Sequence, residues 1–323
     1  MGDRDEAKGA GSPWRDYWRL GHADVAGDAA SGTGAGRTDA AWLPWFADIS
    51  GGAKVLDLCT GGAAVLRNAA QAAQAAGKSF DLIGVDEALL PEDPSLVALG
   101  VRRTGGTSIT ALPFPDSAFD VVTSQFGIEY ADHSPALSEV ARVARPSASV
   151  RFLLHHADSE ITRQATASLA AYDAVIGDGR LVDQCRTAYA SRLNGAPEDE
   201  AARNGQALRA AVLAVAARVG ADPALSTTRY MLSYINDLAM GLDRYSPMSA
   251  LQCIQDFEDR NAAWRERHRL QVAAAMDSPA LDAFLAICEQ NHLSLRARAE
   301  WRDPVGGLMG WLVDLSRAPD GRG

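Results

Sequence analysis

The stretch AKVLDLCTGGAA, residues 53–64, decides how the rest of the chain is organised. Its residues 54–58 are mostly apolar or β-branched, with Asp57 near the end, which predicts a short buried strand. Residues 59–62 are small and predict a tight turn. The run AAVLRNAAQAAQAAG then has the apolar spacing of a helix and ends at Gly77. A strand, a small-residue turn and a helix form the first half of a nucleotide-binding βαβ unit.

A second predicted strand, FDLIGVDEA, carries Asp86 at its tip. In dinucleotide-binding folds an acid at this strand end binds ribose hydroxyls, ~20 residues after the glycines. Small residues in the preceding turn let a ligand approach the backbone, and the start of the helix presents free N–H groups. We therefore predict that Asp86 binds a ribose; the alternative is an acid that only caps the next turn.

The turn lacks the dehydrogenase pattern G-x-G-x-x-G, because only Gly61 and Gly62 are glycines. The stretch VLDLCTGGAA instead resembles the first motif of class I S-adenosylmethionine-dependent methyltransferases, which is an acid followed by three small residues at alternate positions. Asp57, Cys59, Gly61 and Ala63 fill those positions. Cys59 and Ala63 stand where the family usually has glycine. An unliganded strand-turn-helix is the alternative interpretation of this motif alone.

Two later stretches extend the resemblance in the family's order. LPFPDSAFDVV, residues 112–122, resembles the family's approach to its fourth strand, although Ser108 stands where an acid usually contacts the adenine amino group. ALSEVARVARPSASVRFLLHH, residues 136–156, resembles the family's next helix, turn and fifth strand. Here Pro146 is expected to end the helix, and Ser147 and Ala148 replace the two glycines of the family's turn.

The resemblance implies an α/β fold, a doubly wound Rossmann-like sheet of about seven strands with a C-terminal antiparallel hairpin. The end of the chain agrees with this, because HLSLRARAEWR and LMGWLVDLSRA flank the turn DPVGG. We predict that strands 293–301 and 308–316 pair and close the sheet beside the fifth strand. HLSLRARAEWR alternates apolar and polar residues, as a half-buried strand does.

Three regions of the chain follow from this layout. Residues 1–37 are an N-terminal segment, partly flexible, which includes the linker GTGAG at 32–36 and an aromatic run from Pro13 to His22 expected to form a short helix. Residues 38–157 and 277–323 form the expected S-adenosylmethionine-binding Rossmann-like domain. Residues 158–276 are helical throughout and are expected to be an insertion that caps the active site. The alternatives are that the insert packs on itself or that it serves as a homodimer interface.

The resemblance places the cofactor at the carboxyl ends of the strands. Asp57 is expected to orient the turn or the methionine amine, and Ile109 to contact adenine or to be a core residue. Residues 124–126 are expected to line the methionine end. The complete expected cofactor-binding set is Asp57, Cys59, Gly61, Gly62, Asp86, Glu87, Ser108, Ile109, Ser124, Gln125 and Phe126.

A general base is needed only if the methyl acceptor starts protonated. The candidate catalytic residues are Glu129, His133 and His156, and His155 is a further candidate because it and His156 point to opposite faces. A packed or solvated histidine is the alternative for each, and His133 is also expected to cap the helix that follows. The expected substrate-pocket residues are Tyr17, Tyr130, Tyr230 and Tyr234, with plain core as their alternative.

Composition narrows the class of partner. The 323 residues carry a net charge of -10 and no Lys/Arg block, which disfavours a nucleic-acid substrate. The four cysteines have no zinc spacing, and we expect reduced thiols in a cytoplasmic protein. The N-terminus lacks the apolar core of a signal peptide, and the longest apolar run, AAVLAVAA, is too short to span a bilayer. We expect no membrane partner.

The resemblance, together with these features, implies a metal-independent methyltransferase that uses S-adenosylmethionine, releases S-adenosylhomocysteine and acts on a small molecule by in-line methyl transfer. The fourth-strand tip lacks the Asn/Asp-Pro-Pro-Tyr run of amide- and nucleobase-methylating enzymes. It also lacks an acid at the position where metal-dependent catechol methyltransferases hold magnesium. One alternative is a non-methylating enzyme that uses the same cofactor. Another is a non-catalytic, cofactor-binding regulatory or scaffold protein whose insert binds a partner.

Overall fold

The computed structural model describes Trp14, Tyr17, Trp18 and residues 38–173, 177, 180–219 and 226–318. The other predictions for residues 1–37, including the linker at 32–36, lie outside the described residues. The chain divides into two compact units, one made of Met1–Thr162 and Ala273–Gly323 and the other of Arg163–Val272. We call them the sheet unit and the helical unit.

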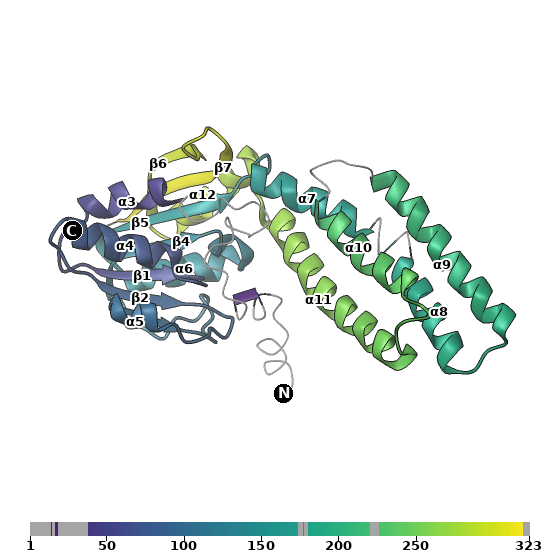
Figure 1. Cartoon of the computed structure of the whole chain (residues 1–323). Coiled ribbons are helices and arrows are strands. Elements are labelled where there is room, and N and C mark those ends of the chain that lie inside the picture. The colour runs from purple at the N-terminus through teal and green to yellow at the C-terminus, as the bar shows by residue number, and fades with distance from the viewer. Residues whose placement is uncertain are drawn as a thin grey trace, which may run out of the picture. The chain divides into compact units, whose positions relative to one another are not determined.

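The sheet unit contains a seven-stranded sheet with the order β3-β2-β1-β4-β5-β7-β6 (Figure 1). Strands β1 to β5 are parallel, and β7 pairs antiparallel with both β5 and β6. The strands are β1 Lys54–Leu58, β2 Asp81–Val85, β3 Val101–Thr104, β4 Phe119–Gln125, β5 Ala144–His155, β6 Leu293–Arg302 and β7 Leu308–Arg317. The predicted fold class is confirmed. The strand order reverses between β1 and β4, and this switch point is where open α/β sheets bind ligands.

Helices cover both faces of this sheet (Figure 1). α3 (Asp39–Asp48) and α4 (Ala64–Ala75) share one apolar core with Val55 of β1. α6 (His133–Val143) and α12 (Ser278–Gln290) share the other with Leu56 and Leu58. Successive side chains of a strand point to opposite faces, so β1 is buried on both sides and its tip is held in place. The short helix α5 (Pro94–Ala98) precedes β3.

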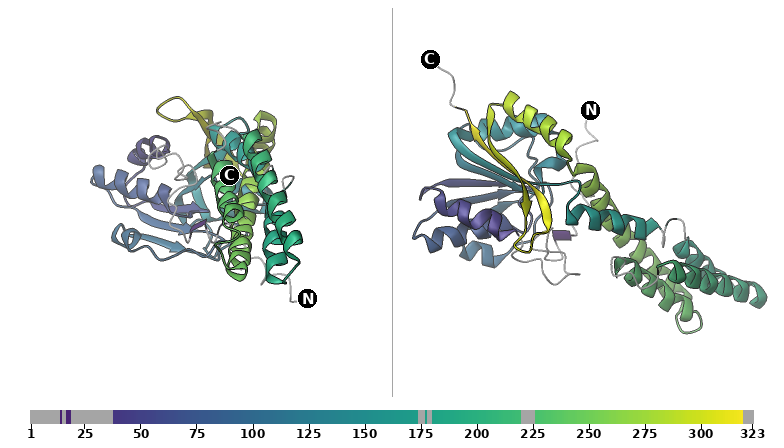
Figure 2. Two further views of the ribbon diagram at one scale, coloured as in Figure 1. Left: turned by 45° about the vertical axis from the view of Figure 1, so that its right-hand side comes forward. Right: turned by 90° about the horizontal axis from the view of Figure 1, so that it is seen from above.

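The predicted C-terminal hairpin is confirmed, with β7 beside β5 (Figure 2). The expectation that its first strand is half buried is wrong. Between its two ends, at Leu293 and Trp301, β6 is largely exposed. The reason is its position, because β6 is the edge strand of the sheet.

The junction between α6 and β5 also differs from the prediction. The helix ends at Val143, three residues before Pro146, and β5 begins at once with Ala144 in an extended conformation. The pairing of β4 with β5 shifts register after Phe119, so the first residues of β5 lie in an irregular part of the ladder. Ser147 has φ +67, a left-handed conformation that glycine adopts most easily. Ser147 thus has a conformation that suits glycine, the family's usual residue at this position.

Arg151 of β5 joins three elements of the sheet unit. Its Nε and Nη2 donate to the two carboxylate oxygens of Asp314 in β7 at 2.6 and 2.7 Å, and its Nη1 donates to the carbonyl of Ala41 in α3 at 2.6 Å. The guanidinium also lies 4.7 Å from the ring centroid of Trp45. The Arg151 side chain is only 11% exposed. The mostly buried bidentate pair joins β5 to β7, and the bond to the Ala41 carbonyl holds α3 against the sheet.

We expect Arg151→Ala to lower the free energy of unfolding by about 3 kcal/mol, because it leaves the Asp314 carboxylate without its bidentate partner. Urea denaturation measures the change. The matched control is Arg102→Ala, which removes an arginine that is 65% exposed and pairs with Asp81. That variant should lose less than about 1 kcal/mol, since exposed ion pairs contribute little. Equal losses in the two variants would contradict this account of Arg151.

The helical unit is built from five helices of the described residues (Figure 1). They are α7 Glu160–Tyr172, α8 Leu181–Leu193, α9 Glu198–Val219, α10 Ser226–Met240 and α11 Pro247–Ala274. The unit has its own apolar core, in which the hydroxyl of Tyr189 donates to the carbonyl of Leu238 at 2.8 Å. On α11, Ile254 and Phe257 of the predicted apolar stripe are buried. The predicted roles of this unit as a cap over the active site or as a homodimer interface depend on what it packs against, and both stay predictions.

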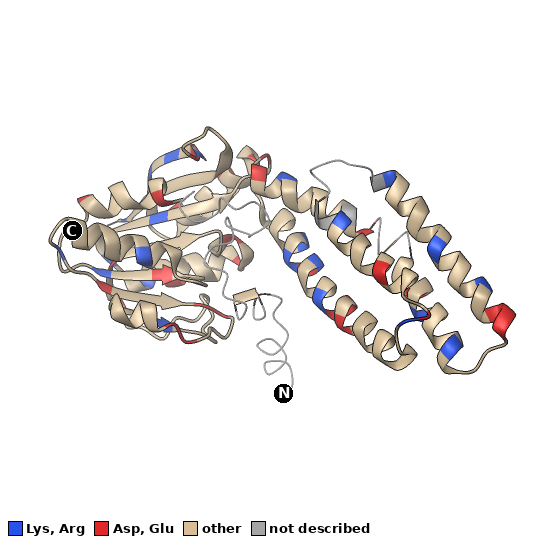
Figure 3. Cartoon of the chain, in the orientation of Figure 1, with Lys and Arg blue, Asp and Glu red and all other residues tan. Residues whose placement is uncertain are grey.

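None of the helices in the described segments is long and apolar enough to cross a membrane. Figure 3 shows acidic and basic residues interspersed along the ribbons of the described residues.

Candidate active site

The carboxyl ends of β1, β2, β4 and β5 bring together most of the predicted site residues of the sheet unit. Because these strands are parallel neighbours, the residues that follow them meet at one edge of the sheet. Cys59 and Gly61 follow β1, Asp86 follows β2, and Phe126 follows β4. His155 is the last residue of β5. This edge is the candidate active site.

The turn after β1 has the conformation of a glycine-rich turn, although only part of it is glycine. Gly61 has φ +44, Cys59 has φ +52 and Ala63 has φ +63. Residues other than glycine seldom adopt this left-handed region. Cys59 and Ala63 therefore stand in conformations that glycine, the family's usual residue at these positions, adopts most easily.

Asp86 holds this turn closed. Its Oδ2 accepts the Gly61 backbone N–H at 2.9 Å and its Oδ1 accepts the Ala88 backbone N–H at 2.8 Å. The Arg103 Nη1 donates to the Gly61 carbonyl at 2.5 Å. Burial raises the pKa of Asp86, while the two backbone N–H groups act to lower it. The acid thus caps the next turn, as the alternative interpretation proposed, and a carboxylate still has further lone pairs for a ligand.

Asp57 and Ser124 tie β1 to β4. The Thr123 hydroxyl donates to Asp57 Oδ1 at 2.8 Å, and the Ser124 hydroxyl donates to the Leu58 carbonyl at 3.1 Å. Ser124 Oγ also accepts the Ile128 backbone N–H at 3.1 Å. Asp57 is 2% exposed, and burial raises its pKa to about 7. Both side chains therefore hold the ends of β1 and β4 together at the site.

The residues after β4 shape the wall beside the turn. Gln125 Oε1 accepts the Trp42 indole N–H of α3 at 2.6 Å. Phe126 has φ +51 and is buried, with its ring centroid 4.5 Å from that of His155. At Gly127 a Cβ atom would stand 2.4 Å from the Cβ of Cys59 and 3.1 Å from Ser124 Oγ. The two turns approach so closely that only glycine fits at position 127.

We expect Gly127→Ala to lower the free energy of unfolding by about 1–3 kcal/mol, because its methyl group overlaps Cys59. The double variant with Cys59→Gly should recover most of this loss, since the overlapping atom is gone and position 59 has a conformation that favours glycine. Urea denaturation of the two single variants and the double variant gives the coupling. Additive effects would show that the contact is not the cause.

Among the candidate bases, the structure pairs Glu129 with His155. Glu129 Oε1 accepts the backbone N–H of His155 at 2.9 Å and lies 2.7 Å from its ring Nδ1. His156 lies elsewhere, with its ring stacked 4.3 Å from Trp311 and its Nδ1 accepting the Asp158 backbone N–H. The sequence reasoning considered Glu129 and His155 separately and missed the pair.

His133 does not cap α6, so that expectation is wrong. It is the first residue of the helix, Asp132 occupies the N-cap position, and no side chain caps the helix there. The His133 ring packs edge-on against Phe284 at 5.0 Å, with Nε2 3.4 Å from the Glu129 carbonyl. The apolar contact with α12 explains this orientation.

Three aromatic residues near the N-terminus lie against the site; we call Trp14, Tyr17 and Trp18 the aromatic cluster. A Cβ atom on Gly61 would stand 2.3 Å from the Trp18 ring, so the indole lies directly against the turn. Tyr17 is 5% exposed and packs edge-on against Trp18. Trp14 lies 5.6 Å from the ring of Tyr130. The sequence predicts a helix on the domain here, but not its place over the glycine turn.

The remaining predicted site residues lie as follows. Ile109 is buried in the core shared by α6 and α12, and Ser108 Oγ lies 2.9 Å from Thr110 Oγ1. Glu87 is exposed. In the helical unit, Tyr230 is 72% exposed and Tyr234 stacks on Phe257 at 4.7 Å. The roles of these residues in binding the cofactor or the substrate stay predictions.

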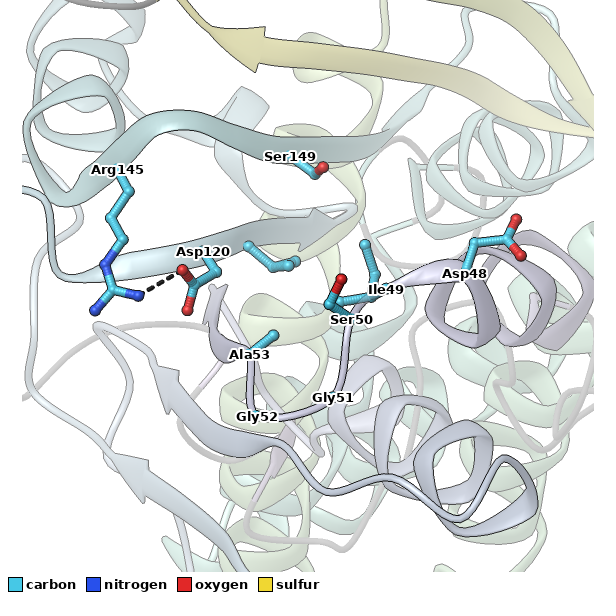
Figure 4. A pocket seen from close by; sticks show the side chains of 10 residues that line it. Asp48, Ile49, Ser50, Gly51, Gly52, Ala53, Asp120, Arg145 and Ser149 are labelled. Atoms are coloured by element: carbon cyan, nitrogen blue, oxygen red, sulfur yellow. Dashed lines mark hydrogen bonds and ion pairs between the residues drawn. The ribbon is translucent and has the colours of Figure 1, made fainter.

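A pocket of about 460 Å³ lies at the opposite ends of the strands (Figure 4). Its lining includes Asp120 at the start of β4, and Arg145 and Ser149 of β5. Arg145 pairs with Asp120 at 2.5 Å. The pocket is thus at the amino ends of β1 and β4, away from the candidate active site. In the described part of the chain, no group of three or more His, Cys, Asp or Glu residues is placed to hold a metal ion.

Comparisons with known proteins agree with this geometry. Residues 31–152 match the model of a family described as a methyltransferase domain. The chain is 36% identical over 109 residues to the ubiquinone/menaquinone biosynthesis C-methyltransferase UbiE of Geobacter sulfurreducens, covering 30% of this chain and 40% of that protein. It is 33% identical over 106 residues to demethylmenaquinone methyltransferase of Thermus thermophilus, covering 29% and 43%. The chain thus spans less than half the length of these relatives.

Among solved structures, the chain aligns with the 1,6-didemethyltoxoflavin-N1-methyltransferase of Burkholderia thailandensis at 12% identity and a TM-score of 0.41, over 91% of this chain and 81% of that one. The match of residues 31–152 and the order of the seven strands agree with the motifs at residues 53–64, 112–122 and 136–156. Residues 31–152 thus match a methyltransferase domain, in agreement with the class I S-adenosylmethionine-dependent methyltransferase family that the three motifs resemble.

Proposed function

We propose that the protein is an enzyme that transfers the methyl group of S-adenosylmethionine to a small molecule without a metal ion. The observation that carries this proposal is the bond between the buried Asp86 carboxylate and the Gly61 backbone N–H at the switch point of the sheet. An acid at the tip of β2 and a turn after β1 are how Rossmann-like sheets present a nucleoside site.

The residues at this edge fit the cofactor. Asp86 uses one acceptor position of each oxygen for Gly61 and Ala88, so ribose hydroxyls can donate to the remaining lone pairs. Asp57, buried beneath the turn, can attract the cationic amine of the methionine part. The bound cofactor supplies a methyl group already activated by the positive sulfur. The chain's own task is then to align the acceptor and to exclude water.

The Trp18 indole lies directly against Gly61 of the turn, where we propose that the cofactor binds. Cofactor binding therefore requires this ring to shift. The tryptophan fluorescence of the protein should change when the cofactor binds.

The named relatives support the reaction class and leave the acceptor open. Their alignments cover less than a third of this chain, and the helical unit falls outside the matched family model. We propose that the acceptor is a small molecule because the turn of β4 is lined by packed aromatic side chains rather than by a basic surface.

Isothermal titration calorimetry with S-adenosylmethionine and S-adenosylhomocysteine tests the binding part of the proposal. Release of S-adenosylhomocysteine in the presence of a panel of small acceptors, followed by mass spectrometry, tests the transfer. Binding of the cofactor without turnover on any acceptor would favour the alternative of a cofactor-binding regulatory or scaffold protein. Absence of binding would refute the proposal as a whole.

A further inference from the structure

Three buried polar atoms at the carboxyl ends of β4 and β5 have no hydrogen-bond partner among the described residues. They are Glu129 Oε2, the Tyr130 hydroxyl and His155 Nε2. The side chains of Glu129 and His155 are both 0% exposed. Buried polar groups in folded proteins are nearly always paired, so three unpaired atoms in neighbouring residues indicate the place of a polar ligand or of ordered water.

The pairing of His155 with Glu129 fixes which ring nitrogen is free. Glu129 Oε1 already accepts the backbone N–H of His155, so the contact of 2.7 Å between the same oxygen and His155 Nδ1 assigns the proton to Nδ1. The backbone N–H of His155 donates to the same oxygen at 2.9 Å and holds the carboxylate in place. Nε2 then carries a lone pair. A histidine oriented by a carboxylate, with its other nitrogen free to accept a proton, is the arrangement of a general base.

This pair lies next to the turn of the cofactor site. Gly127, two residues before Glu129, packs against Cys59 of the turn. Burial raises the pKa of the Cys59 thiol, and the charges of Asp86 and Glu129 both add to the rise, which places both acids near this sulfur. The base and the cofactor turn are thus parts of one edge.

The surroundings of the three unpaired atoms are aromatic. The ring of Phe126 lies 4.5 Å from the His155 ring, and the ring of Tyr130 lies edge-on to it at 5.7 Å. Trp14 of the aromatic cluster packs against Tyr130. Burial raises the pKa of Tyr130 well above its ordinary value, so its hydroxyl stays protonated. Aromatic walls favour a planar aromatic ligand. Two unpaired acceptor atoms favour a ligand with two donor groups.

We propose that His155 Nε2 is the general base of the methyl transfer and that the acceptor is an aromatic compound with two neighbouring hydroxyl groups. This inference rests on the proposed function. One acceptor O–H gives its proton to Nε2, and its electron pair stays on the oxygen. That pair forms the new bond to the methyl carbon as the carbon–sulfur bond breaks, with its electron pair remaining on sulfur. The second hydroxyl donates to Glu129 Oε2, and the Glu129 carboxylate stabilises the imidazolium.

A chromophoric probe separates the proton transfer from the methyl transfer. 4-Nitrocatechol has two neighbouring hydroxyl groups, and its anion absorbs visible light more strongly than the neutral form does. Bound to the wild-type protein without cofactor, it should ionise at a lower pH than in water, with about a tenfold larger anion fraction at a pH below its ordinary pKa. A probe that does not bind, or that binds without ionising, overturns the proposal and leaves the three atoms with ordered water only.

The key variant is His155→Asn, whose amide N–H₂ can replace Nδ1 as the donor to Glu129 but which has no basic nitrogen. It should bind the probe without the increase in anion. The control is His268→Asn in α11 of the helical unit, which should behave as wild type. Equal ionisation by wild type and His155→Asn would show that another group takes the proton. If the variant does not fold, ¹⁵N NMR of wild-type His155 decides instead: a proton on Nδ1 and none on Nε2 is expected, and the opposite tautomer overturns the proposal.

Calorimetry with S-adenosylmethionine on the same samples distinguishes a failure of this inference from a failure of the proposed function. If the cofactor binds but the probe is not ionised, the base and acceptor class are wrong while the methyltransferase proposal stands. If the cofactor does not bind, the proposed function fails, whatever the probe shows.

Discussion

Asp86→Ala is expected to weaken the binding of S-adenosylmethionine about 10- to 100-fold. Charge-assisted hydrogen bonds from the ribose hydroxyls to the carboxylate contribute about 1.5–3 kcal/mol, which corresponds to this range of dissociation constants. The variant also loses the bonds that hold Gly61 and Ala88, so the turn itself is less ordered before the ligand arrives. Both effects act in the same direction. Calorimetric titration of wild type and variant measures the difference.

The matched control for this experiment is Asp81→Ala. Asp81 lies at the opposite end of the same strand, β2, and its exposed ion pair with Arg102 contributes little to stability. Its affinity for the cofactor should equal that of the wild type. Titrations are made well below the melting temperature of each variant, so that a loss of folded protein is not taken for a loss of affinity. Wild-type affinity in Asp86→Ala would remove Asp86 from the site.

Asp57→Asn is expected to stabilise the free protein at neutral and alkaline pH. Burial raises the pKa of Asp57 to about 7, so the folded state binds a proton more tightly than the unfolded chain does. Below about pH 4 both states are protonated and the carboxyl has no effect on stability. As the pH rises from about 4 to about 7, the unfolded chain ionises first and the folded state becomes less stable. Above that window the loss is complete.

The size of the effect follows from the same shift. A rise from 3.8 to about 7 corresponds to roughly 4 kcal/mol. Asparagine keeps an oxygen that can accept from the Thr123 hydroxyl and has no charge to bury. Urea denaturation of both proteins should therefore give a difference near zero at about pH 4 that grows to roughly 4 kcal/mol at about pH 8. A difference that does not change with pH would mean that Asp57 is ionised normally in the folded protein.

The same variant should bind the cofactor more weakly, because the charge that attracts its cationic amine is lost. Functional sites often contain a buried acid that lowers the stability of the free protein but increases its affinity for the ligand. Opposite signs of the two effects in one variant would support a binding role for Asp57. A stabilised variant with unchanged affinity would leave Asp57 with a structural role alone.

The sequence predicted the sheet because its motifs depend on local backbone geometry. The strand, turn and helix at residues 53–77 could be read from the order of apolar and small residues alone. Where Cys59, Ala63 and Ser147 replace the family's glycines, the structure has the left-handed conformations that glycine favours.

What the sequence did not predict depends on contacts between distant residues. Glu129 and His155 meet only because β4 and β5 are parallel neighbours with their carboxyl ends at one edge. Trp18 reaches Gly61 from a segment whose composition gives no indication of its partner. The start of β5 before Pro146 follows from a register shift against β4, which no local pattern reports.

The most direct test of the central claim is a crystal structure of the protein with S-adenosylhomocysteine. We expect the nucleoside at the carboxyl ends of β1 and β2, with its ribose hydroxyls within hydrogen-bond distance of the Asp86 carboxylate and the Trp18 ring moved from Gly61. A ligand bound instead at the amino ends of the strands, beside Asp120 and Arg145, or a protein that takes up no ligand at all, would contradict the account.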